Sequence, residues 1–159
     1  MNEIGESAQF LEVSACLTGF SGVELQTTGM AAAYEAKLRQ VYGDVIVAQL
    51  LGAVRAIIAA ADGNTAELER LMLARVFNDA TVLCAPAKNL AQMWYLGTFI
   101  DYTDSNPVVV FKRTTVISAE AYRQSLVLVD SGSHPRGAKQ PGYGSWALGP
   151  RPASSKERT

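Results

Sequence analysis

The sequence has little of what marks common chemistries: one histidine, two cysteines and none of the short catalytic motifs. There is no glycine-rich dinucleotide loop after a strand, no Walker A loop, no HExxH motif and no CxxCH haem attachment. The lone His134 precedes a proline, and a zinc site would need at least three protein ligands. Asp130 and Ser133 lie near it, but a glycine- and proline-rich segment does not fix a triad. We therefore expect no catalytic, cofactor-binding or metal site, although folding could still assemble one.

The two cysteines, Cys16 and Cys84, lie far apart and lack CxxC spacing. One disulfide between them is conceivable, but each lies in an apolar helical pattern, which favours free, buried thiols. They do not identify a cellular compartment. The N-terminus is acidic and has no basic region followed by an apolar one, so we expect no secretion signal in this sequence and leave a cytoplasmic location open.

Charged residues make up only 18% of the chain, with a net charge of −1. So few charges favour a protein that buries surface against a partner. The basic residues do not alternate with aromatic ones on a helix face, so a nucleic-acid partner is not supported. The charges are unevenly distributed along the chain. From Ser131 onward the only acidic residue is Glu157 and basic residues are in excess, so residues 1–130 carry a net negative charge. The basic residues of that segment are Arg136, Lys139, Arg151, Lys156 and Arg158.

The 159 residues suit one domain, which at this size hides about 68 to 70% of its unfolded surface. We divide it into a helical body, residues 1–130, and an extended arm, residues 131–159. The arm is too rich in glycine and proline for a regular element. Its Tyr143, Trp146 and Leu148 need an apolar surface. We therefore expect the arm to pack on the body, on another protein, or on both.

The body should be mainly α, with about five to six helices. Apolar residues recur at helical spacing over residues 7–17, 30–42, 44–61, 65–76, 88–95 and 119–129. Thr27 or Thr28, Thr65 and Ser118 are the predicted N-caps, and Gly43 is predicted at a left-handed C-terminal position. A kink or restart is expected at Pro86. The run 108–111 is the one plausible strand.

Residues 44–61 form the most hydrophobic segment. A membrane span needs about 20 apolar residues, and this segment is shorter and contains Gln49 and Arg55. We therefore predict a buried central helix and no membrane span. Near residue 94, two aromatics and a methionine gather at a helix end, which fits a core cluster as well as a partner hot spot.

Four motifs occur in a defined order: FLEVSACLTG at residues 10–19, WYLG at 94–97, SAEAYRQS at 118–125 and PGYGSW at 141–146. The arrangement resembles the small (gamma) subunit of bacterial FAD-dependent sugar and polyol dehydrogenases. This is the sorbitol, fructose and glucose dehydrogenase group, which is gluconate 2-dehydrogenase subunit 3-like. The resemblance spans nearly the whole chain.

The resemblance implies a mainly helical, non-catalytic subunit. Its partner would be a large flavoprotein of the glucose-methanol-choline oxidoreductase type, which holds the FAD, and a multihaem cytochrome c subunit often completes such complexes. The small subunit is associated with maturation and export of the large one, which implies the periplasm. This sequence lacks the usual twin-arginine leader.

Our leading hypothesis is therefore an accessory, chaperone-like subunit whose arm clasps the flavoprotein. The alternative is a stand-alone helical ligand-binding domain or enzyme, with a pocket near Trp94 and the arm as a lid. A third interpretation is a helical module for another protein family. The predicted packing and interface residues are Trp94, Tyr95, Gly97, Pro141, Gly142, Tyr143, Gly144 and Trp146.

Overall fold

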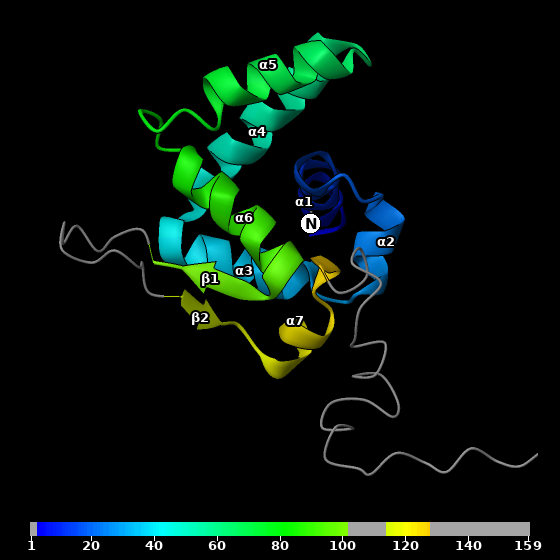
Figure 1. Cartoon of the computed structure of the whole chain (residues 1–159), viewed down its shortest axis with the longest axis vertical. Coiled ribbons are helices and arrows are strands. Elements are labelled where there is room, and N and C mark those ends of the chain that lie inside the picture. The colour runs from blue at the N-terminus through cyan, green and yellow to red at the C-terminus, as the bar shows by residue number, and fades with distance from the viewer. Residues whose placement is uncertain (1–2, 102–113, 128–159) are drawn as a thin grey trace, which may run out of the picture.

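The computed structural model describes residues 3–101 and 114–127 (Figure 1), and these form seven helices and one two-stranded sheet. The predicted mainly α fold is confirmed. The arm, His134 and the predicted strand at 108–111 lie outside the described residues. The elements are α1 (Glu3–Thr18), α2 (Gly22–Thr27), α3 (Ala31–Tyr42), α4 (Asp44–Ala61), α5 (Thr65–Arg75), α6 (Cys84–Leu96), β1 (Thr98–Ile100), β2 (Thr114–Val116) and α7 (Ala119–Arg123).

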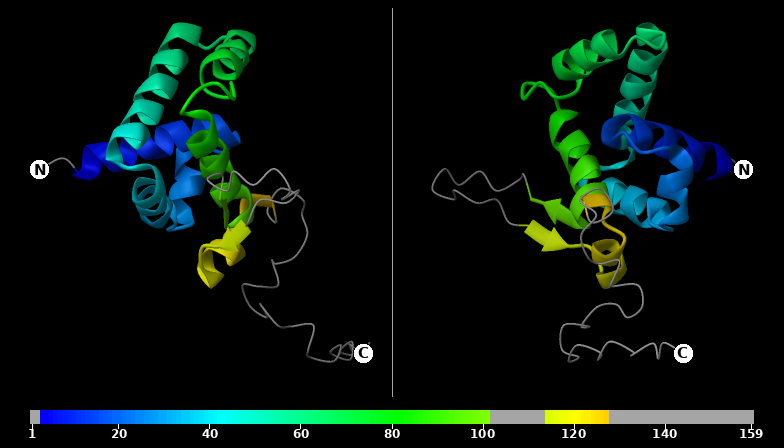
Figure 2. Two further views of the ribbon diagram at one scale, coloured as in Figure 1. Left: turned by 90° about the vertical axis from the view of Figure 1, so that its left-hand side faces the viewer. Right: turned by 45° about the vertical axis from the view of Figure 1, so that its right-hand side comes forward.

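Helices α1 and α6 organise the body, because each packs against several others. Helix α1 contacts α2, α3, α4 and α6, and α6 in turn contacts α3, α4, α7 and β1 (Figure 2). The apolar face predicted for α1 enters one continuous core. Its largest fully buried side chains are Trp94, Tyr34, Phe10, Leu25, Leu38, Leu50, Ile57, Leu90 and Met93.

Helix α4 spans the predicted residues but is not the buried central helix that we expected. It pairs with α5 at one end of the body (Figure 1), and only 33% of its residues are buried. Val45 at its start is 70% exposed. Its apolar residues therefore extend beyond the face that meets the core. Among the described helices it alone has the length and hydropathy of a membrane span, a property that core helices of soluble proteins share.

One short helix was not predicted, and the starts of two other helices differ from the prediction. A short helix, α2, was missed, although Ser21 and Glu24 form a capping box in which each side chain accepts a hydrogen bond from the other's backbone N–H. The residue that precedes helix α3 is Met30, and not the predicted Thr27 or Thr28. The Thr28 hydroxyl instead accepts a hydrogen bond from the N–H of Met30. Asn64, one residue before the predicted Thr65, caps α5 by accepting from the N–H of Glu67.

The structure differs from the prediction at Gly43 and at Val41. Gly43 has φ of +81° as expected, but its ψ of 157° is not that of a left-handed helical residue. Instead it turns the chain directly into α4. Val41, predicted on the apolar face of α3, is exposed.

The prediction for Pro86 is confirmed, because α6 starts just before it. Pro86 lies in the first turn of α6, where no intrahelical partner for its missing N–H is required. Gly97 ends α6, and the chain continues into β1, which pairs antiparallel with β2. The sequence analysis missed these three-residue strands. Ser118 caps α7 as predicted, but α7 ends at Arg123, well before residue 129.

Gly97 joins α6, the sheet and α7. Its φ of +66° is left-handed, and a β-carbon placed on it would lie 2.5 Å from the backbone carbonyl of Ala121. Its own carbonyl oxygen accepts a hydrogen bond from the N–H of Ile117 at 3.0 Å. Glycine is therefore required here by both the backbone conformation and the close approach of α7.

We predict that Gly97→Ala destabilises the body more than alanine at any other described glycine. The left-handed conformation costs about 1–2 kcal/mol for an L-residue. Overpacking against Ala121 adds about 1–3 kcal/mol. Thermal and urea unfolding of the variant would measure the loss.

Two glycines provide matched controls. Gly63 has φ of +78° with open space around it, so Gly63→Ala should show the conformational cost of about 1–2 kcal/mol alone. Gly52 is helical and also open, so Gly52→Ala should stabilise by about 0.5–1 kcal/mol. Equal losses for Gly97→Ala and Gly63→Ala would contradict the close packing of α7.

Candidate functional site

The WYLG motif lies at the C-terminal end of α6, and its tryptophan is a core residue. Trp94 is 1% exposed, and its ring meets that of Tyr34 edge to face, with centroids 4.8 Å apart and planes at 89°. Such pairs contribute about 0.5–1.5 kcal/mol beyond the area they bury. The indole Nε1–H of Trp94 and the hydroxyl of Ser14 are both buried without a hydrogen-bond partner among the described residues. Of the two interpretations left open by the sequence, the core cluster therefore describes Trp94 in this chain.

Tyr95 ties α6 to the end of α1. Its hydroxyl donates to the carbonyl oxygen of Thr18 at 2.6 Å, across 77 residues of sequence. The Thr18 hydroxyl in turn donates to the carbonyl oxygen of Ser14 at 2.8 Å. The Tyr95 ring also meets Phe20 edge to face at 6.1 Å. One side of Tyr95 is thus held by the turn that follows α1.

Three of the four sequence motifs therefore meet in space at the end of α6. Tyr95 joins the WYLG motif to the segment at residues 10–19, and Gly97 joins it to α7 within the segment at residues 118–125. The fourth motif, PGYGSW, lies outside the described residues, and so do Pro141, Gly142, Tyr143, Gly144 and Trp146.

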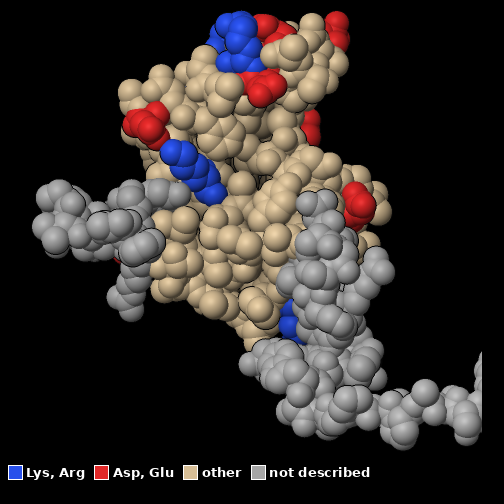
Figure 3. Space-filling model, in the orientation of Figure 1, with Lys and Arg blue, Asp and Glu red and all other residues tan. Residues whose placement is uncertain are grey.

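An open groove, called the α6 groove below, runs along the face of α6 that is turned away from the core. Its volume is about 410 Å³, and it is lined by Phe77, Lys88, Ala91, Gln92 and Tyr95. Four of these residues lie on one face of α6, at spacings of three and four, while Phe77 comes from the loop after α5. Figure 3 shows that the face of the body seen in Figure 1 is mostly uncharged. The acidic and basic side chains on it gather chiefly toward the α4–α5 end.

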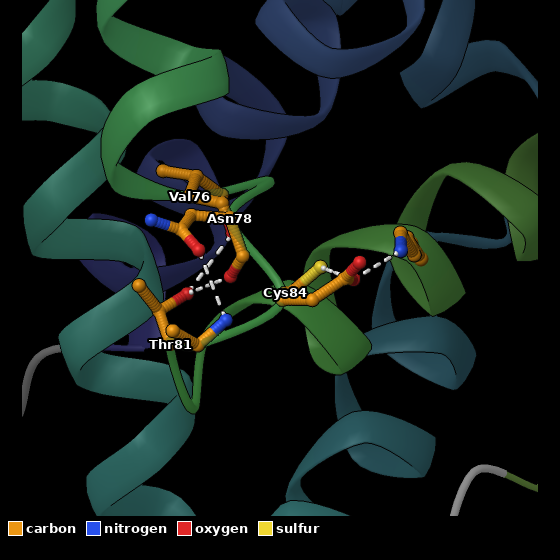
Figure 4. A network of polar contacts seen from close by, with 7 residues as sticks. Val76, Asn78, Thr81 and Cys84 are labelled. Atoms are coloured by element: carbon orange, nitrogen blue, oxygen red, sulfur yellow. Dashed lines mark hydrogen bonds and ion pairs between the residues drawn. The ribbon is translucent and has the colours of Figure 1, made fainter.

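The α5–α6 loop that carries Phe77 is fixed by its own polar contacts (Figure 4). The Thr81 hydroxyl lies 2.9 Å from the carbonyl oxygen of Asn78 and 3.2 Å from that of Val76. The Asn78 side chain accepts a hydrogen bond from the N–H of Ala80 at 3.0 Å. Loop side chains that bond to nearby backbone in this way stabilise a single turn conformation. The groove thus has one rigid wall on α6 and one on an internally bonded loop.

Asp79 connects this loop to α6 through two side chains. Its Oδ1 accepts from the Lys88 ammonium at 2.8 Å and from the Cys84 thiol at 3.3 Å. Burial, and next the hydrogen bond to Asp79, hold the pKa of the Cys84 thiol above its usual range. The same carboxylate raises the pKa of Lys88 to about 12.

These shifts limit what the cluster can do chemically. A thiol with a raised pKa is protonated at neutral pH, and a lysine with a raised pKa is charged, so neither is an activated nucleophile. Both cysteines are free thiols, as predicted, although Cys16 is only partly buried. Among residues 3–101 and 114–127, no group of three histidine, cysteine or acidic side chains is placed to hold a metal ion. The groove lining presents two aromatic rings, one amide, one methyl group and one ammonium group that is paired with Asp79.

Sequence reasoning missed Asn89, the most fully bonded buried side chain near this site. Its amide nitrogen lies 2.8 Å from the Tyr42 hydroxyl and 2.8 Å from the carbonyl oxygen of Ile100, and its amide oxygen accepts from the N–H of Ile100 at 2.8 Å. It thereby pairs with β1 as a neighbouring strand would. The one available signal was an amide within the apolar pattern of α6. Phe77 and Lys88 were also missed, because nothing in their local sequence places them beside Tyr95.

Comparison with protein-family models, with curated proteins and with solved structures finds no match to this chain.

We predict that Tyr95→Phe lowers the free energy of unfolding by about 0.5–1.5 kcal/mol, since the Thr18 carbonyl loses its donor. Chemical denaturation would measure it. Tyr122→Phe, at a residue 47% exposed, is the control and should be neutral. Equal stability of the two variants would show that water replaces the Tyr95 hydroxyl at Thr18.

Proposed function

We propose that this chain is a non-catalytic small subunit of an FAD-dependent sugar dehydrogenase complex. In this role it binds a flavoprotein large subunit of the glucose-methanol-choline type and assists its maturation. The large subunit holds the FAD and oxidises the sugar, and a cytochrome c subunit is a further candidate partner. If the pair is exported, both subunits belong in the periplasm.

The observation that carries this proposal is the meeting of three resemblance-bearing motifs at the end of α6. Residues 10–19, 94–97 and 118–125 are far apart in sequence, yet Tyr95 bonds to Thr18 and Gly97 packs on Ala121. Motifs that form one structural unit support a resemblance in fold better than motifs scattered over a surface would.

The surface of the body is a second source of support. Large apolar side chains are exposed on several elements, and the site chemistry favours binding over catalysis. Exposed apolar residues scattered singly are also common on proteins without a partner, so they are consistent with a subunit role and do not require it. The exposed large apolar residues are Val23, Val41, Val45, Leu73, Val82, Leu96, Val116 and Tyr122.

The α6 groove keeps a second function in view, a stand-alone helical domain that binds a small ligand. Its volume falls within the range of small-molecule sites, and Lys88 and Gln92 would provide polar contacts. The two proposals differ in what purifies with the chain: a flavoprotein in the first and a monomer with bound small molecule in the second.

The deciding experiment is co-expression with a flavoprotein large subunit of the glucose-methanol-choline type. Purification through a tag on this chain, followed by an absorbance scan, should give a yellow, stoichiometric complex. The complex should be lost when the chain is cut after Ser131. A colourless monomer, beside a flavoprotein that is active without it, would overturn the proposal.

Within such a complex, we predict that Trp146→Ala weakens the affinity roughly 30-fold or more, the loss of a hot-spot residue worth about 2 kcal/mol. Biolayer interferometry with the purified large subunit would measure it. Glu69→Ala, which removes an exposed polar side chain on α5, is the control and should bind normally. Unchanged affinity and complex yield for Trp146→Ala would remove this residue from the interface.

A further inference from the structure

The α6 groove has the character of a site for an extended, proline-rich segment. Phe77 and Tyr95 provide aromatic walls, Ala91 leaves room between them, and the Gln92 amide lies beside the groove with its nitrogen bonded to Thr98 Oγ1 at 2.8 Å. Grooves lined by aromatic rings are what proline-rich segments bind in other proteins, because such segments are already extended and lose little entropy. The internally bonded α5–α6 loop holds Phe77 in place without a ligand.

The chain itself contains a segment that combines prolines and glycines with large apolar side chains. Four of its six prolines, together with Tyr143, Trp146 and Leu148, follow Val127, where the described residues end. Within it, PGYGSW at residues 141–146 places two aromatics between glycines. A tryptophan side chain buries about 150–250 Å² when it finds an apolar site. Trp146 is therefore the residue of this segment with most to gain from the groove.

The position of Val127 allows this contact. The described chain ends just after α7, and α7 packs on the end of α6 at Gly97. Helix α6 has 13 residues and is about 20 Å long, and the 19 residues from Val127 to Trp146 span up to roughly 60 Å. The segment after Val127 thus starts beside α6 and is long enough to reach the α6 groove.

We propose that residues 141–146 of the same chain dock along the α6 groove, with Trp146 seated between Phe77 and Tyr95. This contact belongs to the isolated chain and goes beyond the role in a dehydrogenase complex. It places the arm on the body without any partner. The docked arm and α6 then form one surface.

The chain has two tryptophans, which makes the proposal directly testable by fluorescence. Trp94 is buried, so an aqueous quencher such as iodide reports mainly on Trp146, and the Trp146→Phe variant provides the Trp94 baseline to subtract. In the full-length wild-type protein, Trp146 should emit at short wavelength and resist quenching. Ala91→Glu places a charged side chain in the groove, so Trp146 emission should shift to long wavelength and quenching should rise toward that of free tryptophan.

Ala36→Glu, on an exposed position of α3 away from the groove, is the matched control and should behave as wild type. Circular dichroism checks that both variants are folded. A wild-type Trp146 as quenchable as free tryptophan would overturn the proposal without any groove variant. Protection that survives in folded Ala91→Glu would place Trp146 elsewhere, and protection that disappears on dilution would assign the groove to another copy's arm. Either result rejects the contact within one chain, and neither bears on the dehydrogenase complex, because no flavoprotein is present.

Discussion

The close approach of α7 to Gly97 determines how α6, the β1–β2 sheet and α7 are arranged. A β-carbon at Gly97 would collide with the carbonyl of Ala121, so this contact exists only because the residue is glycine. The same left-handed turn ends α6 and starts β1, and its carbonyl accepts from Ile117 just after β2. One residue therefore sets the relative positions of a helix, a sheet and a second helix.

Helix α6 has one face in the core and another in the groove. Trp94, Leu90 and Met93 face the core, while Lys88, Ala91 and Gln92 line the groove. Tyr95 serves both, since its hydroxyl is bonded to Thr18 and it also lines the groove. A binding surface built on a helix fixed at both ends is preorganised, so a ligand or arm that uses it loses less entropy than one that must order its own site. Binding on this face is thereby coupled to the rigidity of the core.

Most of the helical body could be predicted from the sequence, because apolar spacing and caps are local signals. Ser118 acts through its side-chain hydroxyl and Pro86 through its missing N–H, and both positions were located correctly because these effects are local. The short strands and the Asn89 contacts could not be found, since they depend on Ile100 lying beside α6. Helix α4 shows another limit: apolar composition predicted burial, but which residues meet the core depends on packing partners. The alternative hypothesis placed a pocket near Trp94, but the lining of the α6 groove could not be predicted, because Phe77 and Tyr95 come from segments that are brought together only by folding.

The two tryptophans illustrate why similar side chains suggest different roles once the fold is known. Trp94 lies on a helix face with apolar neighbours at three- and four-residue spacing, so the core takes it up and it has no surface left to offer a partner. Trp146 lies outside the described residues, and the glycines and prolines around it in the sequence predict no regular element there, so its apolar contacts are expected to come from a distant surface. The proposed docking of residues 141–146 would supply those contacts from the α6 groove. Recognition of a partner would then begin from a surface that the chain has already assembled.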